Sequence, residues 1–221
     1  MRQIPSQSRF HRDSSPKGGA KYKKEIAMNI CVYGASSDRL DSIYFEEAEK
    51  LGRLIAENGC TMVFGGGRTG LMGACAQGVR KAGGRIIGIS PKFFDEPGIL
   101  DEGCDEFYFT GTMRERKQLM EEKSDSFIAL PGGIGSYEEF FEILTLKQLG
   151  RHAKPIALLS TADYYAPFYA MLEHTAKLGF MSDSCLGIFR LCRSPEEALE
   201  HVLTEKCEAR NVQYGLFNYN K

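Results

Sequence analysis

Short apolar segments alternate with amphipathic helical segments along most of the chain, and this alternation constrains the fold more than any other sequence feature. The first cycle reads NICVYG, then a helical pattern over about residues 42–57 that Gly59 ends, then TMVF at residues 61–64. A strand, a helix and a second strand in this order form a βαβ unit, in which the two strands run parallel. Because the apolar runs are nearly continuous, both faces of the strands are expected to be buried.

The same cycle repeats toward the C-terminal region. Further strands are predicted at residues 85–90, 107–109, 126–130 and 155–160 and around residues 187–192. The helices between them are predicted near residues 71–82, at 113–122, after the PGGIG turn, near residues 165–178, and from Pro195 onward. We therefore predict an α/β fold with three layers, a doubly wound, Rossmann-like, mostly parallel sheet with helices on both faces.

The N-terminal residues differ in composition from the rest of the chain. Residues 1–27 contain seven lysines and arginines against two acidic residues, with Ser, Pro and Gly between them. This pattern predicts a disordered basic tail over residues 1–27 and one domain over residues 28–221, a length that a single hydrophobic core can fill. A transit peptide would also be basic, but no sustained amphipathic period is present. Met28 directly precedes the first strand and is an alternative start of the chain.

Charge and cysteine usage narrow the class of function. The net charge of -1 gives no overall basic field for nucleic acid, and no apolar run approaches the ~20 residues that a membrane helix needs. Seven cysteines are scattered without a CxxC pair, which indicates reduced, buried thiols in a cytoplasmic protein. The four histidines lack metal-ligand spacing. We therefore expect a small-molecule partner, no nucleic-acid or membrane partner, no metal and no cofactor.

Two glycine-rich loops follow predicted strands. PGGIGSYEE begins at Pro131 and opens directly onto a helix, and GGGRTGLMG begins at Gly65. Glycines let the backbone approach a ligand closely, and the first turn of a helix offers unpaired N–H groups and a positive dipole end. The candidate binding residues are Gly66, Gly67, Gly70, Met72 and Gly73 in one loop and Gly132, Gly133, Gly135 and Ser136 in the other. Because both loops and YGASS at residues 33–37 follow strands, they are expected to converge on one crevice.

The first loop also matches the dinucleotide pattern G-x-G-x-x-G through Gly65, Gly67 and Gly70. A dinucleotide site is disfavoured, because the match follows the second strand and the next strand ends without the acidic residue that would hold a ribose diol. Tight turns without any ligand would account for either loop alone, but they account less well for both.

Charged residues near the loops permit two interpretations. Ser136 and Glu139 have the S-x-x-E spacing of a capping box, and the segment MRERKQLMEEK, which contains Arg116 and Lys117, has the pattern of a solvated helix face. Alternatively, Glu138 and Glu139 lie at a helix start beside a candidate anion site, where a carboxylate could face a developing cation. Composition alone does not separate a structural role from a catalytic one.

In combination, GGGRTGLMG, MRERKQLM and PGGIGSYEE with FFEILTLKQLGRHAKPIALL resemble the LOG ("lonely guy") family, over about residues 29–181. The resemblance implies a phosphoribohydrolase that cleaves the N-glycosidic bond of cytokinin-type adenosine 5'-monophosphates to a free base and ribose 5-phosphate. It also implies a homodimer, with Arg116 and Glu139 as catalytic residues. Lys117, Glu138 and the glycine-loop residues named above are then expected to bind the substrate and its phosphate, with Ser136 in place of the usual threonine.

The sequence departs from the family pattern at one position. The family commonly has a substrate-contacting glutamate eighteen residues before the arginine, where this chain has Gly98, with Glu96 two positions away. The preferred base therefore stays open between prenylated adenine, plain adenine and another base.

Other functions remain alternatives at this point. A non-catalytic nucleotide-binding or sensing module would keep the glycine loops. A pyridoxal-phosphate lysine decarboxylase would need a Schiff-base lysine, for which Lys117 and Lys147 are available without a surrounding cofactor pattern. The helix after Ser136 has an apolar face formed by Phe140, Phe141 and Leu144, which we expect to lie in the core rather than in a subunit interface.

Overall fold

The computed structural model describes residues 28–205, so the predicted tail over residues 1–27 lies outside the described residues, as does the segment 206–221. The strands form one seven-stranded sheet in the order β4-β3-β2-β1-β5-β6-β7, and all six strand pairs are parallel. The strands are β1 (Asn29–Tyr33), β2 (Thr61–Phe64), β3 (Arg85–Pro91), β4 (Glu106–Thr110), β5 (Ser126–Ala129), β6 (Ile156–Leu159) and β7 (Arg190–Cys192). The predicted doubly wound parallel sheet is confirmed.

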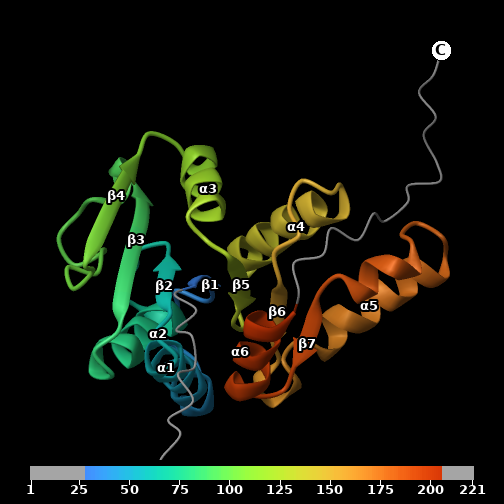
Figure 1. The fold of residues 1–221 in the computed structure, drawn as a ribbon, viewed down its shortest axis with the longest axis horizontal. Coiled ribbons are helices and arrows are strands. Elements are labelled where there is room, and N and C mark those ends of the chain that lie inside the picture. Colours follow the sequence, from blue (N-terminus) through green and yellow to red (C-terminus); the bar gives the residue numbers. More distant parts are fainter. Residues whose placement is uncertain (1–27, 206–221) are drawn as a thin grey trace, which may run out of the picture.

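The helices of the described residues cover both faces of this sheet (Figure 1). They are α1 (Ser42–Glu57), α2 (Gly70–Lys81), α3 (Met113–Glu122), α4 (Ile134–Gln148), α5 (Ala166–Lys177) and α6 (Pro195–Thr204). Buried residues of α1, α2 and α6 form one apolar cluster with the sheet, and buried residues of α3, α4 and α5 form a second cluster. The molecule therefore has the three layers that the sequence predicts, with a core on each side of the sheet.

Local sequence signals explain where several helices begin. Thr112 and Glu115 form a reciprocal capping box at the start of α3, and the Ser194 side chain caps α6, whose first residue is Pro195. Both devices satisfy backbone N–H groups that have no partner within the helix. The predicted bounds of the helix over residues 42–57 agree with α1.

One detail of the prediction agrees with the structure and another is wrong. The short strand expected around residues 187–192 is β7, which begins at Arg190 because Asp183–Gly187 form a 3-10 turn before it. On α4, Phe140 and Leu144 lie in the core as expected, but Phe141 is 37% exposed. Phe141 therefore lies at the edge of the buried stripe, where a helical periodicity cannot separate core from rim.

The sheet order places a ligand crevice next to β1. The chain adds strands on one side of β1 up to β4 and then crosses to β5 on its other side. In open parallel sheets, such a reversal separates two neighbouring loops at the carboxyl ends of the strands and opens a crevice between them. The loops after β1 and β5 flank this point, so the fold itself brings YGASS and PGGIG together.

The burial of the cysteines agrees with the prediction from the sequence. Of the six cysteines in residues 28–205, five are buried and Cys104 is partly exposed. Burial raises the pKa of the Cys31 thiol to about 12, which keeps it protonated. Within the described part of the chain, no helix is both long and apolar enough to cross a membrane.

Candidate functional site

A cleft of about 620 Å³ lies at the carboxyl ends of the strands. Its walls come from the loop after β1, the loop after β2, the end of β3, the start of α3 and the start of α4. Seven of the residues predicted from the sequence line it: Gly67, Met72, Arg116, Gly133, Gly135, Ser136 and Glu139. The crevice predicted from the strand pattern is therefore present in the structure.

A buried ion pair lies at one wall of this cleft. Nη1 of Arg116, on α3, donates a hydrogen bond of 2.8 Å to Oε1 of Glu139, on α4. Both residues are 8% exposed, and Nε of Arg116 also donates to the carbonyl of Ile89 at 3.3 Å. The guanidinium, which α3 carries, is thus held by β3 and α4. Arg116 in turn holds the carboxylate of Glu139 in place. A buried, paired carboxylate that lines a cleft is the kind of group that can stabilise a developing positive charge.

Glu139 does not cap α4, so the capping-box interpretation is wrong. The helix begins at Ile134 with Gly133 as its N-cap, and no side chain forms a cap hydrogen bond. Ser136 therefore lies inside the first turn, and Glu139 lies one turn further on and contacts Arg116. The S-x-x-E spacing misleads here because the glycine turn starts the helix three residues earlier than the serine would.

The start of α4 offers unpaired amides to the cleft. The N-cap and the first three residues of a helix carry N–H groups without a helical acceptor. Those four residues, 133–136, all line the cleft, and the first hydrogen bond of the helix runs from the Tyr137 amide to the Gly133 carbonyl. The positive end of the helix dipole adds to these donors. This end of the cleft is therefore suited to a phosphate group.

The start of α2 is different, because its first amides already have acceptors within the chain. The amide of Gly70 donates to Oδ1 of Asp38 at 2.8 Å, and the amide of Leu71 donates to the carbonyl of Ala35 at 2.8 Å. The carboxylate of Asp38 occupies the position that an anion would take. Two of the amides at the start of α2 are thus occupied, and the GGGRTGLMG loop is held against the loop after β1. None of the four amides at the start of α4 has an acceptor among the described residues.

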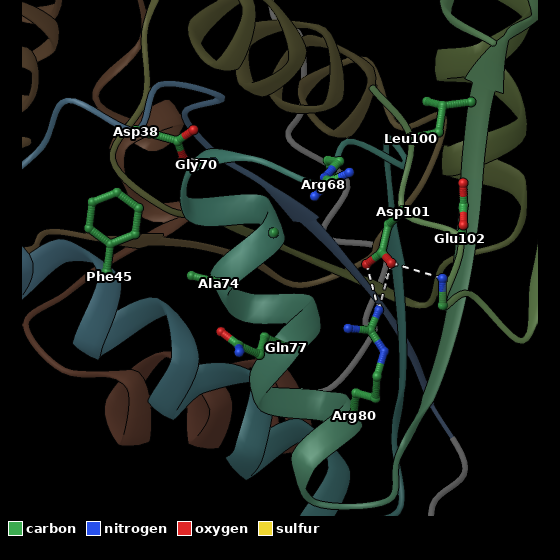
Figure 2. A pocket seen from close by; sticks show the side chains of 12 residues that line it. Asp38, Phe45, Arg68, Gly70, Ala74, Gln77, Arg80, Leu100, Asp101 and Glu102 are labelled. Carbon is green, nitrogen blue, oxygen red and sulfur yellow. Dashed lines mark hydrogen bonds and ion pairs between the residues drawn. The ribbon is translucent and has the colours of Figure 1, made fainter. Parts of the chain in front are cut away.

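Gly70 and Gly73 line a second, separate cavity of about 670 Å³ between α1, α2 and the segment 100–103. Figure 2 shows this cavity, in which the Arg80 guanidinium points to the carboxylate of Asp101. That ion pair has N–O distances of 2.6 and 2.7 Å. Arg80 and Asp101 thus neutralise each other, and the catalytic candidates lie in the other cavity.

Lys117 and Glu138 lie beside the cleft but do not line it. The ammonium of Lys117 pairs with Glu138 and, at 2.6 Å, with Glu142 of α4. Burial lowers the pKa of Lys117, but its hydrogen bonds to Glu138 and Glu142 outweigh burial and raise the pKa above its ordinary value. In this structure Lys117 joins α3 to α4 next to the Arg116–Glu139 pair. Gly66 and Gly132 also lie outside the lining residues.

The segment around Gly98 gives the cleft an apolar wall. Gly98 has φ of 83°, a left-handed conformation that strains any residue with a side chain. Where the family pattern has a glutamate, this chain thus has a glycine in a left-handed turn. Glu96 does not line the cleft. Phe94, Ile99 and Leu100 line it instead. This side of the cleft is suited to an apolar group.

Several lining residues were not among the predicted site residues, although most of them lie in the segments YGASS, GGGRTGLMG, MRERKQLMEEK and PGGIGSYEE. They are Gly34, Ala35, Ser36, Gly65, Thr69, Ser90, Phe94, Ile99, Leu100, Met113 and Ile134. Gly65 has a specific role, since a Cβ atom there would lie 2.1 Å from Nη2 of Arg116. Only a glycine leaves room for the guanidinium, and the signal for this position was its place at the start of the GGGRTGLMG loop after β2.

The pKa of Glu139 gives a testable prediction. Burial raises the pKa above the ordinary value of 4.5, although the neighbouring Arg116 lowers it. Because folding favours the protonated carboxyl, its contribution to stability is present below pH 4.5 and is lost as the pH rises through the raised pKa. Besides Glu47, whose pKa burial also raises, we expect the Glu139 resonance to titrate above 4.5 in a ¹³C NMR titration of protein labelled at the glutamate carboxyl carbons. Glu139→Gln should remove that resonance, and a Glu139 resonance that titrates below 4.5 would contradict the prediction.

This chain is similar to several known proteins over a region that includes Arg116 and Glu139. The sequence profile of a family described as "Possible lysine decarboxylase" matches residues 72–202. A cytokinin riboside 5'-monophosphate phosphoribohydrolase from Rhodococcoides fascians is 41% identical over 172 residues, which cover 77% of this chain and 87% of that protein. The cytokinin riboside 5'-monophosphate phosphoribohydrolase LOG2 from Arabidopsis thaliana is 37% identical over 165 residues, 75% of this chain and 78% of that protein.

Solved structures share the fold. The molybdenum cofactor binding protein from Rippkaea orientalis has a TM-score of 0.62 and 26% sequence identity, and the match covers 79% of this chain and 94% of that chain. The family profile spans both members of the Arg116–Glu139 pair and the start of α4.

Proposed function

We propose that this chain, which belongs to the LOG family, hydrolyses the N-glycosidic bond of cytokinin-type adenosine 5'-monophosphates and releases the free base and ribose 5-phosphate. The observation that carries the proposal is the presence of two groups in one cleft. The buried Arg116–Glu139 pair and the free amides at the start of α4 both line it. Such a cleft matches a substrate with a phosphate at one end and a bond to be broken next to a carboxylate.

The chemistry of the bond assigns a role to each charged group. When the bond between C1' of the ribose and the base nitrogen breaks, its electron pair leaves with the base and positive charge develops on the sugar. Glu139 stabilises that charge and accepts a proton from the attacking water, whose oxygen bonds to C1'. The base nitrogen takes a proton from solvent as it leaves, and Glu139 then releases the proton of the attacking water to solvent. Arg116 holds the carboxylate in place and neutralises it in the resting site.

The phosphate orients the substrate. Bound to the amides of residues 133–136, it would place the ribose toward Glu139, which lies on the first turns of the same helix. Binding energy from this remote group is then used to position the bond that breaks. A nucleoside without the phosphate should therefore be a much poorer substrate than its monophosphate.

The apolar side chains that line the cleft are suited to the base. Phe94, Ile99, Met113 and Ile134 line the cleft, and each has an exposed apolar side chain. Adenine with an apolar substituent would cover more of this surface than plain adenine, at about 25 cal/mol per Å² of apolar area. We accordingly expect prenylated adenosine monophosphate to be preferred over AMP.

A base-release assay tests the proposal. Purified protein is incubated with isopentenyladenosine 5'-monophosphate, AMP and adenosine, and the free base is measured by chromatography. We expect release from both monophosphates, with a kcat/KM for adenosine lower by roughly 10²-fold or more. No base release from a panel of nucleoside 5'-monophosphates would contradict the proposed function.

The alternative functions make different demands on the same cleft. A Schiff-base decarboxylase needs a lysine in its site, and no lysine is among the residues that line this cleft in the part of the chain described. A non-catalytic binding module would hold a nucleotide and leave it intact, which the same assay detects. We also propose that the chain forms a homodimer, which a measurement of its mass in solution tests. The proposed location of the protein is the cytoplasm.

A further inference from the structure

Three successive carbonyl groups of the turn before α4 are held by hydrogen bonds from other segments. The Tyr165 hydroxyl donates to the Leu130 carbonyl at 2.7 Å, and the Tyr164 hydroxyl donates to the Gly132 carbonyl at 2.7 Å. Between them, the Ala35 amide donates to the Pro131 carbonyl at 3.0 Å. Two tyrosines that are adjacent in sequence thus hold the carbonyl groups of the turn. Both tyrosines lie in the segment between β6 and α5.

These bonds determine where the amides of the turn point. A peptide unit is planar, and its C=O and N–H groups point in opposite directions. The Gly132 carbonyl belongs to the same peptide unit as the Gly133 amide, so Tyr164 directs that amide away from itself. Gly133 lines the cleft. The tyrosine therefore acts on the first of the four amides that are available to an anion.

The backbone that delivers the two tyrosines is strained. Ala162 has φ of 49° and Asp163 has φ of 58°, both in the left-handed region that residues with a side chain rarely adopt. The Ser160 hydroxyl accepts a hydrogen bond of 2.9 Å from the Tyr165 amide, which braces the segment. Strain of this kind persists only where the surroundings fix the conformation, and it concentrates near functional sites.

The two hydroxyls are suited to act as permanent donors. Burial raises the pKa of Tyr164 to about 12 and raises that of Tyr165 further, so both stay protonated at neutral pH. The Tyr137 hydroxyl, on α4, lies 3.4 Å from the Tyr164 hydroxyl and donates to it. Tyr164 can therefore accept from α4 and donate to the turn at the same time.

We propose that Tyr164 and Tyr165 are positioning residues, which hold the turn at residues 130–133 so that the amides at the start of α4 bind the phosphate of the substrate. Neither tyrosine lines the cleft, so each acts through the backbone of the turn. The inference rests on the proposed function only in taking a sugar phosphate as the ligand of those amides.

The variants Tyr164→Phe and Tyr165→Phe test the inference, because each removes one hydroxyl and keeps the ring. We expect the Kd for ribose 5-phosphate, measured by calorimetry, to rise roughly tenfold in each variant. The KM for the nucleoside monophosphate should rise with it, while kcat changes less and the kcat/KM for the free nucleoside stays near the wild-type value. A merely structural role would lower the melting temperature without this dependence on the phosphate.

Tyr169→Phe is the matched control, since Tyr169 lies on α5 and packs against Phe189 away from the turn. It should leave the Kd for ribose 5-phosphate unchanged. Tyr164 is only partly buried, so Tyr164→Phe alone decides the question if Tyr165→Phe fails to fold. An unchanged Kd in a folded Tyr164→Phe variant, or a wild-type protein that binds no ribose 5-phosphate, would overturn the inference. A wild-type protein that binds it but releases no base would contradict the proposed function and leave the tyrosine inference standing.

Discussion

Replacing Glu139 with glutamine is expected to reduce kcat for base release by about 10³-fold. Glutamine has nearly the same shape and can still accept the hydrogen bond from Nη1 of Arg116. It cannot stabilise the cationic sugar as a carboxylate does, and it cannot take the proton from water. The KM should change little, because in the proposed arrangement the phosphate and the base bind elsewhere in the cleft.

The stability of this variant must be measured alongside its activity. The exchange leaves the buried Arg116 without its counter-charge, so we expect a loss of about 1–3 kcal/mol in the free energy of unfolding. A denaturant titration measures that loss, and the assay is run where the variant is folded. Glu173→Gln, on the exposed surface of α5, is the control and should keep wild-type turnover. Turnover within about threefold of the wild type in folded Glu139→Gln would refute the assignment of Glu139.

The second large effect is expected at Gly65, which carries no functional group. An alanine there would place its Cβ atom 2.1 Å from Nη2 of Arg116, closer than any non-bonded contact allows. The guanidinium must then move, although the Ile89 carbonyl and Glu139 hold it. A displacement of about 1 Å in a positioned group can cost about 10² in rate, and we expect Gly65→Ala to lower kcat by that factor.

Gly65 has no positive φ, so the alanine fits the backbone and only the space is missing. The fold should therefore persist, with a melting temperature close to that of the wild type. Gly187→Ala serves as the matched control, because it lies outside the cleft and no atom lies within 4 Å of the place that a Cβ atom would take there. Wild-type kcat in Gly65→Ala would show that the position of Arg116 does not limit the reaction.

The two predictions concern the same ion pair, and they separate its chemistry from its geometry. Glu139→Gln removes a charge and keeps the geometry, whereas Gly65→Ala keeps both charges and moves one of them. If both variants lose turnover while ribose 5-phosphate still binds, the pair acts on the bond that breaks. A loss of ribose 5-phosphate binding in either variant would instead place the pair in the phosphate site.

The elements of the fold could be predicted from the sequence because their signals are local. The helix over residues 42–57 and the strand at residues 61–64 agree with α1 and β2, since apolar periodicity is repeated many times within each element. The bounds of the short strand β7 and the partial exposure of Phe141 could be predicted less accurately. Each depends on what packs against it, which the local pattern does not contain.

The site could be predicted in part. Glycine turns after apolar strands predict loops at one end of a parallel sheet, and the family resemblance identified Arg116 and Glu139. The start of α4 was misread, because Ser136 and Glu139 have the spacing of a capping box while Gly133 is the actual N-cap. A spacing pattern states which contacts a helix start can form, and the position of the start itself depends on the preceding turn.

By itself, the sequence determined the parallel α/β architecture, the strand ends at which a ligand could bind and the charged residues available there. Only the tertiary structure decided how those residues are used. It joined Arg116 to Glu139 across 23 residues, paired the Gly70 amide of α2 with Asp38, and left the amides at the start of α4 without an acceptor among the described residues. It also brought Tyr164 against a turn that lies 32 residues earlier in the chain. The physical reason is that periodicity and turn chemistry act between near neighbours, whereas a hydrogen-bond partner is set by which segments the sheet order brings together in space.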